Sequence, residues 1–379
     1  MLEMMMTIPV LLWLLTVFAL GLGAGSFIGQ AVYRLPFEKS VFWPTKSHCM
    51  SCLTPLRMFD NIPVLGYLRL RGKCRHCGQA FSSKYMWVEL VTGLAFVAVF
   101  LIEILPQSAG GPAFLKPWFK TPGLQFPFLD VQHPLPPLKV WAFWAAHCLL
   151  ICLLFTASLI DAEHRIIPTT ITYPGTLAGI IICMLMPWPW PSDPRLVHAE
   201  PGVPMWIMPH YEGKILHGEQ MWPAIGPPPA WAPAGSWKLG LLNGLVGAAA
   251  GMLCGRGLKF IYESARGKEA LGLGDADLLM MIGAFLGWQV AVLALPLGAV
   301  FSLAFVIPNA IYQWIRKQPI DPLLPFGPGI AMAAVATWLL WPVLNEAMRM
   351  SFDWLVTATA LGIPAIALAA CGLILRRRG

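Results

Sequence analysis

The chain has 379 residues, of which 57% are hydrophobic and only 12% are charged, with a mean hydropathy of +0.64 and a net charge of +7. Soluble globular domains carry about a quarter charged residues, so this composition excludes an ordinary soluble protein. We predict an all-α polytopic membrane protein that is surrounded by lipid and has no nucleic-acid partner.

The apolar runs predict the transmembrane helices. A helix needs about 20 residues to cross the hydrocarbon core, so the run at 278–315 must be two spans, broken near Gly287 to Pro296. The run at 85–102 contains one charge, Glu89. The first run follows Glu3 and has no Lys or Arg before it, which favours a retained helix over a signal peptide. About nine helices follow from the runs at 4–33, 85–102, 140–160, 166–192, 239–255, 278–315, 322–345 and 354–375.

Basic residues predict the orientation, because loops on the cytoplasmic side are enriched in Lys and Arg. With the N-terminus outside, 19 of the 26 basic residues fall on the cytoplasmic side. The segment 34–84 is then cytoplasmic, whereas 106–138 and 189–237 are extracytoplasmic loops to which we assign no chemistry. The remaining divisions are a first helix at 1–33, a second at 85–105 and a membrane-embedded domain at 139–375.

Four cysteines in the 34–84 segment predict a metal site. Cys49, Cys52, Cys74 and Cys77 form two Cys-x-x-Cys pairs that are separated by 21 residues. Cytoplasmic thiols stay reduced, and this spacing lets two knuckles give four thiolates to one tetrahedral Zn²⁺. Redox Cys-x-x-Cys motifs and unrelated buried thiols are the alternatives. We expect a structural zinc, because so small a domain cannot bury much core.

Two aspartates are the candidate catalytic residues. Asp161 lies at the cytoplasmic end of the third predicted helix, and Asp275 follows Gly272 and Gly274 at the start of the sixth. Two carboxylates held close together share a proton, which is the chemistry of aspartic proteases. A helix cap at Asp275, or simple solvation of either residue, is the alternative.

Several ordered motifs resemble the prepilin leader peptidase/N-methyltransferase family of type IV pilus and type II secretion systems. The first is GSFIGQAVYRLP at 25–36, and the zinc segment with Asn61, Ile62 and Pro63 follows it. VELVTG at 88–93, Asp161, the GxGD of residues 272–275 and PFGP at 325–328 complete the resemblance. Gly29 departs from the family's usual Asn, and Asp277 stands where Lys is common.

The resemblance implies a bacterial inner-membrane enzyme that cuts prepilins or pseudopilins after a Gly at the cytoplasmic face. It also implies transfer of a methyl group from S-adenosylmethionine to the new N-terminus, with the zinc segment as the expected methyltransferase domain. Glu89 is either a pairing or proton-accepting group for the product amine, or a structural carboxylate that snorkels to the membrane surface or pairs with Arg. A membrane transporter and a non-catalytic assembly subunit of a secretion system are the competing function classes.

Overall fold

The computed structural model describes residues 2–41, 47–49, 51–103, 138–186, 230–233, 236–266, 272–317 and 325–340. This part of the chain is helical and contains no sheet, only two isolated β-bridges, at His48–Pro55 and Lys73–Ala80. The predicted all-α class is therefore confirmed. Most of the two predicted extracytoplasmic loops, and the predicted span at 354–375, lie outside the described residues.

Two compact units make up the fold, one up to Ile160 and one from Asp161. In the first unit, α1 (Leu2–Arg34) packs against α3 (Lys84–Glu103). Gly25 permits this close approach, since a β-carbon there would lie 2.5 Å from Glu89 Cα. The chain between these helices holds three short helices, η1 (Leu35–Phe37), η2 (Met58–Asp60) and α2 (Leu65–Leu70).

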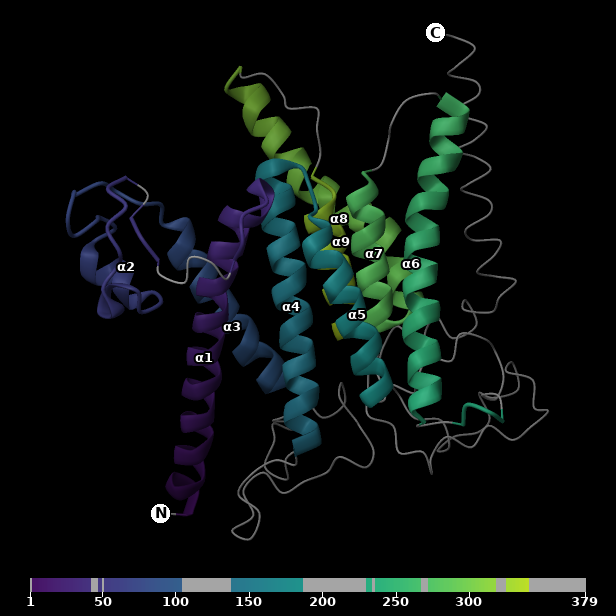
Figure 1. The fold of residues 1–379 in the computed structure, drawn as a ribbon, viewed down its shortest axis with the longest axis horizontal. Coiled ribbons are helices and arrows are strands. Elements are labelled where there is room, and N and C mark those ends of the chain that lie inside the picture. Colours follow the sequence, from purple (N-terminus) through teal and green to yellow (C-terminus); the bar gives the residue numbers. More distant parts are fainter. Residues whose placement is uncertain are drawn as a thin grey trace. The chain divides into compact units, whose positions relative to one another are not determined.

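The helix α4 (Leu138–His164) runs from the first unit into the second (Figure 1). The second unit continues with five helices. The central one is α7, which touches each of the other four. Almost all of α7 is buried, including Leu278, Leu279 and Phe285 at 0% exposure. The five are α5 (Thr169–Leu185), α6 (Trp237–Arg266), α7 (Leu273–Leu286), α8 (Trp288–Ile315) and α9 (Gly327–Leu339).

Eight of the nine predicted spans correspond to these helices, and the long run is broken at Gly287 as expected. Within the described residues, α1, α3, α4, α6 and α8 contain stretches long and apolar enough to cross a membrane. The helices α5 and α9 are shorter and apolar, and the count of nine spans stays a prediction. The chain is thus a helical membrane protein.

Candidate active site and zinc centre

Asp161 lies in the last turn of α4, where its side chain is buried against the start of α9. Its Oδ2 accepts the backbone N–H of Gly327 at 2.8 Å, and only 6% of the residue is exposed. A β-carbon at Gly327 would lie 2.8 Å from that same oxygen, so a larger residue would push the carboxylate aside. The free N–H groups at the N-terminus of a helix favour a negative charge there.

Asp275 is the third residue of α7, and its Oδ2 accepts the N–H of Gly272 at 3.2 Å. Ile167 brings this turn next to Asp161, because its side chain packs against both Gly274 and Gly327. The turns that carry the two aspartates therefore meet at Ile167. The structure thus brings together the two aspartates that the sequence had singled out.

Asp277 faces a different partner. Its Oδ1 accepts a hydrogen bond from Arg256 Nη2 of α6 at 3.0 Å, and only 3% of the residue is exposed. Positions 275 and 277 are about 200° apart on an α-helix, so one aspartate can face Asp161 while the other ties α7 to α6.

The four cysteines predicted as zinc ligands converge on one point. All four sulfurs lie within 4.8 Å of one another, with 3.8 Å between Cys49 and Cys77 and 3.9 Å between Cys52 and Cys74. In a tetrahedral site with Zn–S bonds of about 2.3 Å, neighbouring sulfurs are about 3.8 Å apart. The thiol set therefore fits Zn²⁺, as the knuckle spacing predicted.

The two knuckles repeat the same backbone pattern. The N–H of Cys49 donates to Thr54 O at 3.0 Å, and that of Cys74 donates to Gln79 O at 2.8 Å. Backbone N–H groups also point at the sulfurs: those of Cys52 and Ser51 lower the pKa of Cys49, and those of Cys77 and His76 lower the pKa of Cys74. Hydrogen bonds to the charged form favour thiolates, which are the species that bind zinc.

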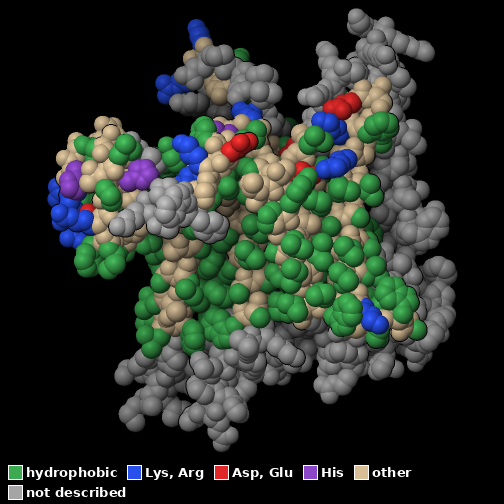
Figure 2. Space-filling model, viewed as in Figure 1, with side chains coloured by type: hydrophobic (Ala, Val, Ile, Leu, Met, Phe, Trp, Pro, Cys, Tyr) green, Lys and Arg blue, Asp and Glu red, His purple; other side chains and the backbone are tan. Residues whose placement is uncertain are grey.

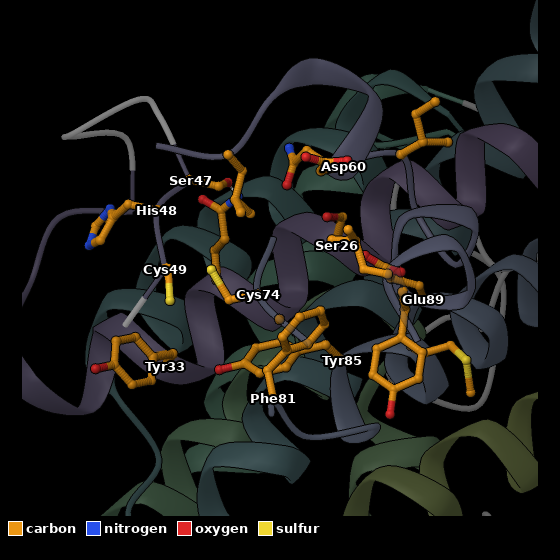
Figure 3. Close-up of a pocket in the computed structure, with 18 of the residues that line it drawn as sticks. Ser26, Tyr33, Ser47, His48, Cys49, Asp60, Cys74, Phe81, Tyr85 and Glu89 are labelled. Carbon is orange, nitrogen blue, oxygen red and sulfur yellow. Dashed lines mark hydrogen bonds between the residues drawn. The ribbon is translucent and has the colours of Figure 1, made fainter. Parts of the chain in front are cut away.

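A cavity of about 230 Å³ lies between the knuckles and the α1–α3 pair, within the first unit (Figure 3). Asp60 borders it, held by two hydrogen bonds from Arg75, one of them from Nε at 2.9 Å. Glu89 borders it from α3 and accepts the N–H of Val64 at 2.6 Å. Four aromatic side chains complete this wall: Tyr33, Tyr67, Phe81 and Tyr85.

Some of these contacts could not be found from the sequence. Glu89 is bonded to a backbone N–H rather than to the arginine that we had considered as its partner. Val64, which supplies that N–H, has φ 59° and ψ −52°, and the N–H of the next residue, Leu65, donates to Pro63 O at 2.6 Å. Such a tight turn is strained for a β-branched residue and has no reliable sequence signal.

Comparisons with known proteins agree with the motifs. Residues 19–102 match the bacterial peptidase A24 N-terminal domain, and residues 148–199 match the type IV leader peptidase family. The second match includes Asp161 and ends before Asp275. No solved structure matches the chain.

Curated relatives carry the name prepilin leader peptidase/N-methyltransferase. The protein of Pectobacterium carotovorum is 26% identical over 85% of this chain and 91% of its own length. That of Dickeya chrysanthemi is 28% identical over 85% and 90%. The Myxococcus xanthus protein is 29% identical over 72% of this chain, which spans only 56% of that relative. These matches bear out the resemblance to this family that the sequence motifs carried.

Proposed function

We propose that this chain, a member of the prepilin leader peptidase/N-methyltransferase family, is an aspartic endopeptidase of the bacterial inner membrane. Its substrates are prepilins or pseudopilins, whose basic leader is cut off after a Gly at the cytoplasmic face. The observation that carries this proposal is the buried pair of Asp161 and Asp275, from the end of α4 and the start of α7. The Lys and Arg distribution supports an outside N-terminus and a dyad at the cytoplasmic surface.

In the proposed mechanism one aspartate is ionised and its partner is protonated. Asp161 is the better-placed base, because the N–H of Gly327 at the start of α9 stabilises its charged form. It takes a proton from water as the water oxygen attacks the scissile carbonyl carbon. Asp275 gives its proton to the carbonyl oxygen, which forms a gem-diol. As this intermediate collapses, Asp161 gives the proton taken from water to the leaving amine, and Asp275 takes a proton back from a gem-diol hydroxyl, so the dyad returns to its starting state.

The second proposed activity is methylation of the new N-terminal amine. The cavity beside the knuckles fits a sulfonium cofactor, because aromatic faces and carboxylates are the groups that bind such a cation. S-adenosylmethionine supplies an electrophilic methyl group when bound. Asp60, Glu89 and the aromatic wall would hold it and the product amine, and Glu89 is the candidate acceptor for the amine proton. Zinc would keep this wall folded.

Co-expression with a prepilin tests both activities, with mass analysis of the pilin N-terminus as the measurement. We expect cleavage and one added methyl group with the wild-type chain. Asp161→Asn and Asp275→Asn should each abolish cleavage in an inserted protein, because an amide cannot cycle a proton. Asp277→Asn is the matched control and should still cleave. A transporter or an assembly subunit predicts instead that cleavage survives both dyad substitutions.

A further inference from the structure

The short helices η2 and α2 present large apolar side chains outward. Met58 is 81% exposed, Phe59 and Leu65 are each 61% exposed, and Leu68 is 57% exposed. We call these four residues the η2–α2 surface. The two helices pack together, since a β-carbon at Gly66 would lie 2.2 Å from Asp60 O. A helix whose outer side faces water is expected to place polar residues there, whereas α2 places Leu65 and Leu68 on its outer side.

The other side of α2 is already occupied. Gly66 is buried, and Tyr67 and Leu70 line the cavity beside the knuckles. Leu65 and Leu68 are three residues apart and therefore share the opposite face of the helix. Refolding α2 to hide these leucines would thus expose the cavity wall, so the apolar outer face needs a partner outside the domain.

The hydrogen bond between Val64 and Glu89 fixes the depth of the η2–α2 surface along the membrane-spanning helix α3. Glu89 is five residues inside α3 from Lys84, so the start of α2 is held about 8 Å within that membrane-spanning helix. On α1, Glu89 lies opposite Gly25, about 14 Å before the end of the helix at Arg34. Figure 1 accordingly draws α2 beside α1 rather than beyond its end.

The exposed tryptophan of α3 indicates the same depth. Trp87 is 55% exposed, and it lies between Lys84 and Glu89 on the helix. Exposed tryptophans near the end of a span mark the boundary between headgroups and acyl chains. The hydrogen bond to Glu89 holds the start of α2 further into the span than Trp87. The outer face of α2 therefore lies at the depth of the lipid interface.

Charge identifies the partner. Arg57 directly precedes Met58, and Arg69 directly follows Leu68. Both arginines are exposed, and both act electrostatically on Asp60. The two arginines therefore border the apolar residues of the η2–α2 surface. Figure 2 shows Lys and Arg beside hydrophobic side chains on the part of the molecule where Figure 1 labels α2. Apolar side chains flanked by arginines are the combination that binds anionic membrane surfaces.

We propose that the η2–α2 surface is inserted into the bilayer leaflet at which α1 ends and α3 begins, with Arg57 and Arg69 on anionic headgroups. The zinc domain is then seated on lipid rather than suspended in the cytoplasm. Its cavity is held at the membrane surface, level with the ends of α1 and α3. This inference rests on the chain spanning the membrane and does not depend on either proposed activity.

Photocrosslinking of the full-length chain tests the inference. The protein carries p-benzoyl-phenylalanine at position 68, or at the control position 73, an exposed lysine in the second knuckle. It is reconstituted in nanodiscs of phosphatidylcholine, alone or mixed with phosphatidylglycerol, and adducts are identified by mass spectrometry. We expect several-fold more lipid adduct at position 68 than at position 73, with phosphatidylglycerol enriched in the adducts from the mixed membrane.

Charge and folding are controlled separately. Arg57→Gln combined with Arg69→Gln should keep the lipid adduct at position 68 and lose the enrichment of phosphatidylglycerol. Bound zinc per chain reports folding of each variant. If the probe at position 68 lowers the zinc content, Phe59 takes the same probe with a smaller change of shape. Lipid adducts equal to those of position 73, or adducts mainly to a second copy of the chain or to a co-reconstituted prepilin, would overturn the proposal.

Discussion

The ion pair between Arg256 and Asp277 makes a sharp prediction, because its two members are buried to different extents. The Asp277 side chain is 5% exposed, whereas that of Arg256 is 45% exposed. Removing the partner of a buried charge costs about 3–5 kcal/mol, since the remaining charge is uncompensated. Arg256 is half in solvent, so we expect Arg256→Met to lower the free energy of unfolding by about 3 kcal/mol, at the lower end of that range.

The reverse substitution should cost less. In Asp277→Asn the arginine is left where water can reach it, and the loss is that of a charged hydrogen bond, about 1.5–3 kcal/mol. The double variant Arg256→Met with Asp277→Leu removes both charges from the contact and should recover most of the stability lost in Arg256→Met. Denaturant unfolding of the purified proteins in one fixed detergent measures all four free energies.

The leader-cleavage assay separates this structural role from catalysis. Asp277→Asn should cleave a prepilin although it is less stable, whereas Asp275→Asn should be as stable as wild type and inactive. A double variant that recovers none of the stability lost in Arg256→Met would show that no coupling links the two side chains. An inactive Asp277→Asn that unfolds like wild type would place Asp277 in the mechanism and refute the assignment.

Three further predictions concern the zinc centre and the dyad. Purified protein should carry about one Zn²⁺ per chain by elemental analysis, and Cys49→Ser should reduce it, whereas metal retained after replacing all four thiols would refute the site. Leu53 has φ 54° where the second knuckle has Gly78, so Leu53→Gly should raise the zinc affinity, by up to about 1 kcal/mol, in a chelator competition. Gly327→Ala places a methyl group 2.8 Å from Asp161 Oδ2 and should slow cleavage in an inserted, zinc-loaded chain; unchanged cleavage rates would contradict the close packing.

Features that depend on local pattern were predicted from the sequence. The break between α7 and α8 falls at Gly287, which has φ 86° and interrupts a run of apolar residues too long for one span. The convergence of the four cysteines followed from ligand chemistry, because a zinc knuckle has few spacings. Both signals lie in short segments whose geometry the residues themselves determine.

Contacts between residues that are far apart in the sequence could not be predicted in this way. Asp277 could be excluded from the face of Asp275 by helical period, but its partner Arg256 lies 21 residues earlier, on another helix. The bond from Val64 to Glu89 depends on a strained turn, and the role of Gly327 depends on α9 packing against the end of α4. The lengths of α5 and α9 were overestimated, because the apolar runs at 166–192 and 322–345 extend beyond Thr169–Leu185 and Gly327–Leu339.

The pairing of Asp60 with Arg75 predicts how the stability of the zinc domain depends on pH. Hydrogen bonds from Arg75 lower the pKa of Asp60, and the charges of Arg75, Arg69 and Arg57 add to this effect while burial opposes it. A carboxyl whose pKa is lower when folded stabilises the fold above its unfolded pKa of about 3.9, and this contribution is lost as pH falls through the lower folded value.

Asp60→Asn should therefore be less stable than wild type by a constant amount between about pH 5 and pH 8, because Asp60 stays ionised throughout that window. The other titrating groups, including the zinc thiols, are shared by both proteins and cancel in the difference. Thermal unfolding of the two zinc-loaded proteins, followed by zinc release, gives that difference at each pH. Arg75→Gln should be destabilised with the same flat profile, since either change removes one pair. A difference that varies across the window would mean that Asp60 titrates there, which is incompatible with the two hydrogen bonds from Arg75.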